Sequence, residues 1–278
     1  MNMEPSPTNS YRELKWTLIS FLGYGLFYGI SQVFGNATIP ITFYIPELSK
    51  SVTVAVPIES WLSMFVTGAA FAILAMKIFI ELYHSERSSI MVHVSPKNMN
   101  VIDGLFIFSV ASYVLFNAVH EVIKFVGYMI DQLPVDVSSS PFATLYNYVY
   151  FYHEYFGHLF SIPLMIIFTI FAFGFLHEPP TRKLKWYAWL FLCAIGLGFG
   201  ATWVEGWAEG ECQVINAIYD LGLVIAIAII FHKNRMKLTA HPLFCVLVVE
   251  ALVFMAGVVI WGFLYGLLPY YPFFKEPP

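Results

Sequence analysis

The residues best suited to chemistry lie in HEYFGH (residues 153–158), where two imidazoles and a carboxylate precede a long apolar run. In the His-Glu-x-x-His motif of zinc proteases, both histidines share one helix face at i and i+4. Here the extra residue would place His153 and His158 about 140° apart on a regular α-helix. Glu154 and His158, at i and i+4, are therefore the pair expected to share an ion, and His153 is expected to lie off the edge of the polar face that they share.

Further ionisable residues are expected at the same membrane level on neighbouring helices. Imidazole and carboxylate groups suit borderline divalent ions such as zinc or ferrous iron. The predicted ligands are His120, Glu154 and His158 together with one of Glu205, Glu209 or Asp220. Glu121 and Glu154 are the candidate catalytic residues that would handle the proton, and either Glu121 or His153 could act as general base on a metal-bound water.

The same residues also allow a purely structural interpretation. A hydrogen-bonded network could hold four helices together, with Lys124 paired to Glu121 or Asp131. A di-iron carboxylate site is disfavoured, because it requires two Glu-x-x-His motifs and the sequence contains none.

The composition is that of a membrane protein. Of the 278 residues, 59% are hydrophobic and only 12% are charged, whereas soluble domains carry about 25% charged residues. The net charge of −4 gives no reason to expect a nucleic-acid partner. The fold class predicted is an all-α, polytopic membrane protein in contact with the lipid bilayer.

Seven apolar stretches are long enough to cross a bilayer. They cover residues 15–34, 60–82, 104–130, 143–176, 185–208, 211–232 and 242–268 as one transmembrane domain. Eleven basic residues fall on one side of the predicted topology: Arg12, Lys15, Lys77, Arg87, Lys97, Arg182, Lys183, Lys185, Lys233, Arg235 and Lys237. Only Lys50 and Lys275 fall on the other. This asymmetry predicts a cytoplasmic N-terminus and an extracytoplasmic C-terminus.

The outer loop 35–59 contains two β-prone runs, 41–45 and 52–56, bounded by prolines. They predict a hairpin that could form a lid over the outer face. Asn36-Ala37-Thr38 also fits a glycosylation sequon.

The angular positions of polar residues indicate which faces of the predicted helices line the site. Polar faces of four helices are expected at one depth, which indicates a polar cavity open to the outside. In helix 185–208, Ala194 and Gly198 share a face on which another helix could pack closely.

Glu250 stands alone in helix 242–268, as either a proton-transfer group or a packing contact. His241 is expected at the cytoplasmic boundary.

Seven helices, an inner N-terminus and membrane histidines resemble the architecture of the seven-helix zinc hydrolases related to adiponectin receptors and alkaline ceramidases. The His-x-x-x-His of their last helix is absent, since helix 242–268 carries only Glu250. The deep lysine of retinal proteins is absent too. The resemblance is therefore architectural, and no residue role is carried over from it.

The function expected from these features is that of a metal-dependent membrane enzyme, most simply a hydrolase acting on a lipid or amphiphile. Two alternatives stay open. One is a cation or proton transporter, in which Glu250 lies further along the path. The other is a non-catalytic subunit bound to partners in a larger membrane complex.

Overall fold

The computed structural model describes residues 12–34, 37–46, 49–85, 94–132, 142–177, 184–209 and 213–265. The Asn36 sequon lies outside these residues. The α-helices are α1 (Arg12–Val33), α2 (Ile58–Leu62), α3 (Gly68–Phe79), α5 (Pro96–Asp131), α6 (Phe142–Phe151), α7 (Ser161–Phe175), α8 (Trp186–Glu209), α9 (Gln213–Lys233) and α10 (Pro242–Tyr265). The strands are β1 (Thr38–Ile45) and β2 (Lys50–Pro57). Shorter helical turns are η3 (Ser63–Thr67), η4 (Ile80–His84), η5 (Tyr152–Phe156), η6 (Gly157–Phe160) and η7 (Leu238–Ala240).

Six helical segments of the described chain are long and apolar enough to cross a membrane. They cover residues 58–84, 96–131, 157–175, 186–206, 215–233 and 242–265. Large apolar side chains such as Ile73, Phe108 and Phe263 are exposed on them, as expected of surfaces that face lipid. The chain is therefore an all-α, multi-pass membrane protein. The predicted first span, 15–34, is the 22-residue helix α1, which is not among the six.

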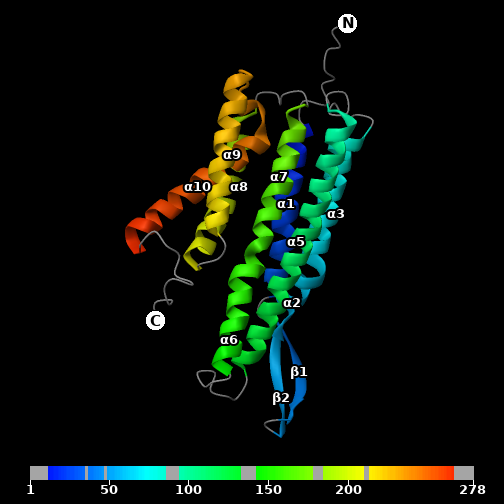
Figure 1. Ribbon diagram of the computed structural model, residues 1–278, viewed down its shortest axis with the longest axis vertical. Helices are drawn as coiled ribbons and strands as arrows, with labels where there is room; N and C mark the ends of the chain where they lie inside the picture. Colours follow the sequence, from blue (N-terminus) through cyan, green and yellow to red (C-terminus); the bar gives the residue numbers. More distant parts are fainter. Residues whose placement is uncertain are drawn as a thin grey trace.

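The helices form two groups that lie side by side (Figure 1). The first contains α1, α3, α5, α6 and α7, and the second contains α8, α9 and α10. Aromatic rings join the groups. Phe21 of α1 stacks on Phe168 of α7 with ring centroids 4.4 Å apart, and meets Phe199 of α8 edge-on at 4.8 Å. The core consequently extends through both groups.

Two glycines on one face of α8 allow α10 to approach closely. A Cβ atom added at Gly196 would lie 2.8 Å from the carbonyl oxygen of Val246. One added at Gly200 would lie 2.6 Å from the carbonyl oxygen of Glu250. Small residues four apart permit this kind of membrane packing. The face predicted to allow close packing carries Ala194 and Gly198. It does not meet α10, because a Cβ atom at Gly198 would meet nothing within 4 Å.

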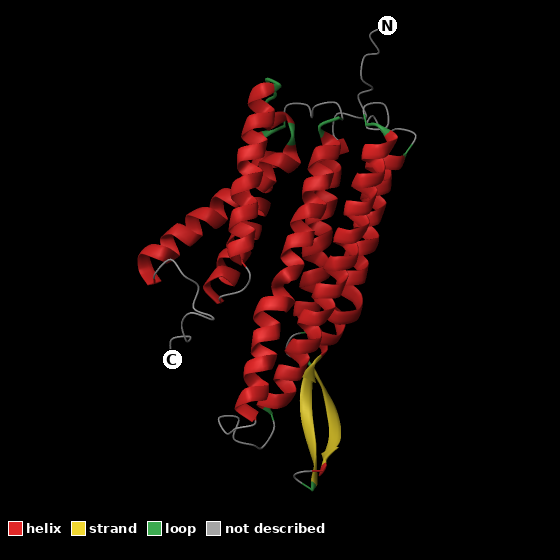
Figure 2. Ribbon diagram, in the orientation of Figure 1, coloured by secondary structure: helices red, strands yellow, loops and turns green. Residues whose placement is uncertain are grey.

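The predicted strands pair as an antiparallel hairpin, with Ile41 opposite Val54. It extends from the end of the bundle and does not fold across it (Figure 2). Its buried valines pack against Phe125 and Met129 of α5. The Gln132 side chain accepts a hydrogen bond from the Ala55 amide at 2.7 Å and donates one to the Ala55 carbonyl at 2.9 Å. These contacts fix the hairpin to the end of α5.

At the opposite end, Glu13 connects α1 to the start of α10. Its carboxylate lies 3.2 Å from Nδ1 of His241 and accepts a hydrogen bond from the Leu243 amide at 3.1 Å. His241 is 3% exposed, so the histidine expected at the cytoplasmic boundary is buried against α1. A carboxylate at a helix N-terminus is also favoured by the helix dipole.

Candidate metal site

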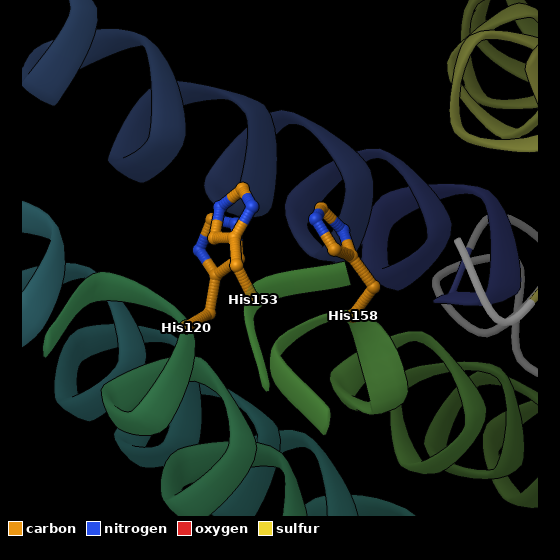
Figure 3. A group of neighbouring side chains, drawn as sticks. All are labelled: His120, His153 and His158. Atoms are coloured by element: carbon orange, nitrogen blue, oxygen red, sulfur yellow. The ribbon is translucent and has the colours of Figure 1, made fainter. Parts of the chain in front are cut away.

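Three histidines converge between α5 and the segment that follows α6 (Figure 3). Each of His120, His153 and His158 offers one potential ligand atom, and these atoms all lie within 4.8 Å of one another. The His120 and His153 rings are stacked with centroids 4.6 Å apart. The His158 ring stands edge-on to both, at 4.6 Å from His120 and 5.1 Å from His153.

A change of helix type brings His153 and His158 to the same side. The predicted continuous helix 143–176 is interrupted, because α6 passes into the π-turn η5 and then the 3₁₀ turn η6 before α7 begins. His153 lies in the π-turn η5 and His158 in the 3₁₀ turn η6. Both turns rotate by a different angle per residue than a regular α-helix does. The angle expected for a regular α-helix is therefore incorrect, and the structure places His153 beside the other two histidines.

Gly157 brings this irregular segment against α5. It is buried, and a Cβ atom added there would lie 3.1 Å from both Cα and Cδ2 of His120. Any other residue would press on His120 or move the segment away. The glycine thus allows the three imidazoles to meet.

Glu121 orients His120. Its Oε1 atom lies 3.1 Å from Nδ1 of His120, and the residue is only 5% exposed. A carboxylate only accepts hydrogen bonds, so Nδ1 carries the proton and Nε2 is left to bind a metal. Metal-binding histidines commonly donate the N–H of their other ring nitrogen to a carboxylate, which fixes the orientation of the ring. The other oxygen of Glu121, Oε2, is buried and makes no hydrogen bond in the described part of the chain.

The three rings are close to the geometry that an ion requires. On a tetrahedral zinc ion with Zn–N bonds of about 2.0–2.1 Å, the nitrogens are about 3.3 Å apart. The candidate atoms lie within 4.8 Å of one another, so each pair must approach by about 1.5 Å at most. Rotation of the imidazole rings can supply shifts of this size.

Of the other predicted ligands, two lie away from the three histidines, and the side chains of two are not among those that the structure describes. Glu205 is exposed on α8, and Asp220 is buried on α9. Nothing is described of the side chains of Glu154 and Glu209. Across the described ranges, the three histidines are the one group of three or more His, Cys, Asp or Glu residues that could hold an ion. Lys124, predicted to pair with Glu121 or Asp131, forms its ion pair with Glu59 at 3.1 Å.

A cavity of about 230 Å³ adjoins the histidines. It lies between α5 and α6 and reaches His153. Its lining combines apolar and charged side chains: Ile123, Lys124, Gly127, Tyr128, Asp131, Val149 and His153. The cavity gives a molecule with both apolar and polar parts a place beside His153.

Comparisons with protein-family models, curated proteins and solved structures found no match for this chain. What is known of the site therefore comes from its own residues and geometry.

Proposed function

We propose that the chain is a metal-dependent membrane enzyme in which His120, His153 and His158 bind a divalent ion. The observation that carries the proposal is the convergence of three imidazoles beside a buried carboxylate that is bonded to one of them. Ionisable groups in membrane segments are energetically costly and usually functional.

Zinc is the ion that this ligand set fits best. Catalytic zinc sites use three protein ligands and keep a fourth position for water or substrate, and three histidines form one such set. Non-haem ferrous sites typically use two histidines and a carboxylate. Among the described residues, no carboxylate completes such a triad here.

Hydrolysis is the simplest reaction for this arrangement. A zinc ion lowers the pKa of bound water to about 7 and so supplies hydroxide at neutral pH. Glu121 and Glu154 are the candidate groups for handling the proton. Glu121 also positions His120, so its loss should affect both binding and rate.

The substrate we propose is a lipid or another amphiphile that enters from the side of the bundle. The cavity between α5 and α6 supports this, because Ile123 and Val149 would contact an apolar chain while Lys124 and Tyr128 would contact a polar head. We further propose that α1 is a seventh span, with the N-terminus in the cytoplasm and the site near the outer leaflet. Support comes from the position of α1 alongside α3 (Figure 1) and from the basic residues of the predicted inner side.

Elemental analysis of the purified full-length protein tests the metal site. We expect bound zinc, which His120→Ala, His153→Ala or His158→Ala should each reduce severely. His84→Ala is the control, because His84 bonds to Asp103 and not to the triad. Metal-free protein whose stability is unchanged by zinc or by a chelator would exclude the site.

Catalysis needs a separate assay. Reconstituted protein is incubated with ester, amide and phosphate amphiphiles, with and without a chelator. Zinc-dependent hydrolysis that is lost in His158→Ala would support the enzyme. Stoichiometric zinc without turnover of any of these classes would instead favour a structural metal site.

A further inference from the structure

A second group of buried ionisable residues lies among α8, α9 and α10, apart from the histidines. Asp220 of α9 and Glu250 of α10 are each 1% exposed. Their carboxyl groups are close enough to interact electrostatically with each other. Trp203 of α8 is 5% exposed and lies beside Glu250. The lone carboxylate expected in the last helix therefore has an acidic neighbour.

The polar atoms of this group lie close to one another, but none of them makes a regular hydrogen bond among the described residues. All four carboxyl oxygens and the Trp203 indole nitrogen are buried without a hydrogen bond in the part of the chain that the structure describes. Within those ranges, no basic side chain forms an ion pair with either acid. Two adjacent carboxylates in an apolar bundle cannot both remain charged at acceptable cost. At least one of the two groups must therefore be protonated or neutralised by a bound cation.

The surroundings favour a proton over a metal ion. Calcium takes six to eight oxygen ligands, and magnesium takes six. The nearby side-chain oxygens are already engaged, since Asn216 bonds to Ser161, and the Tyr219 hydroxyl bonds to Thr169. Trp203 offers an N–H group, which stabilises a carboxylate oxygen but repels a metal cation.

We propose that Asp220 and Glu250 form a proton-binding site that shares one proton between the two carboxyl groups. The indole N–H of Trp203 is positioned to donate to the oxygen that keeps the negative charge. Tyr219 is the other titratable group that interacts with both acids, and its hydroxyl is held by Thr169. Both acids lie within spans that cross the membrane by length and composition, so the site takes up and releases a proton inside the bundle. It is independent of the metal site.

Infrared spectroscopy of the full-length protein in lipid vesicles tests the proposal. At neutral pH we expect the C=O stretching band of a protonated carboxyl group, shifted in heavy water. Asp220→Asn and Glu250→Gln, which preserve shape, should each abolish or shift this band. Glu205→Gln is the control, because Glu205 is exposed on α8, and it should leave the band unchanged.

Trp203→Phe provides a second test that keeps both acids. Without the indole donor the charged form is less stable, so the band should persist to higher pH than in the wild type. The proposal is overturned if no protonated band exists at neutral pH, or if the band survives in both acid variants. It is also overturned if sodium or zinc changes the carboxylate bands in wild type but not in Asp220→Asn.

Discussion

The Gly157 backbone lies so close to His120 that a Cβ atom at position 157 would be 3.1 Å from His120 Cα. This contact joins the irregular segment η5–η6 to α5 at the level of the three imidazoles. In the same segment the helix changes type. The candidate metal site therefore depends on a residue that carries no side chain.

Gly157→Ala should weaken metal binding more than it weakens the fold. The methyl group requires His120 to move by a few tenths of an ångström, and overpacking of this kind costs about 1–3 kcal/mol. Thermal unfolding and zinc titration measure the two effects. Gly104→Ala in α5 is the control, because a Cβ atom there meets nothing within 4 Å. Equal zinc affinity in both variants would contradict the role given to Gly157.

Glu121→Gln should reduce metal affinity about 10–100-fold, the usual effect of losing a carboxylate behind a metal-binding histidine. The amide keeps the shape and an acceptor oxygen but loses the negative charge, so it stabilises the protonated Nδ1 of His120 less strongly. Competition with a zinc chelator measures the change. Asp103→Asn is a matched control on the same helix, since Asp103 bonds to His84 at 2.8 Å. If the two variants bind zinc alike, Glu121 does not support the site.

Gly200→Ala should destabilise the packing of α8 against α10 by about 1–3 kcal/mol. Its Cβ atom would lie 2.6 Å from the backbone oxygen of Glu250, which cannot rotate away. Gly198→Ala faces open space and should be neutral or stabilising, because alanine is a better helix former by about 1 kcal/mol. Thermal unfolding in detergent distinguishes the two. The same loss in both variants would argue against a close glycine contact.

Gln132→Ala should loosen the hairpin without unfolding the bundle. It removes both side-chain hydrogen bonds to Ala55, each with a net contribution of about 0.5–1.5 kcal/mol. Hydrogen exchange at the Ala55 amide should accelerate about tenfold or more. Thr53→Val, which removes the exposed hydroxyl contact with Thr42, serves as the control. Unchanged exchange at Ala55 in Gln132→Ala would show that valine packing alone holds the hairpin.

Much of the fold could be predicted because its signals are local. Long apolar runs report membrane helices directly, since backbone groups in lipid must bond within the segment. The β-prone residues of 41–45 and 52–56, bounded by prolines, likewise predicted the two strands, which the structure confirms. The face of α8 that meets α10 was predicted incorrectly, because Gly196 and Gly198 look alike in sequence and only the neighbouring helix distinguishes them.

The sequence alone indicated the membrane class, most of the helical segments and two of the three converging histidines, because composition and spacing along a regular helix are sufficient for these. Only the tertiary structure placed His153 beside the other two, since its position depends on a change of helix type that no simple periodicity reveals. It likewise brought Asp220 and Glu250 together from different helices. Such contacts depend on how helices tilt and pack, and small residues such as Gly157 and Gly200 decide this packing through space.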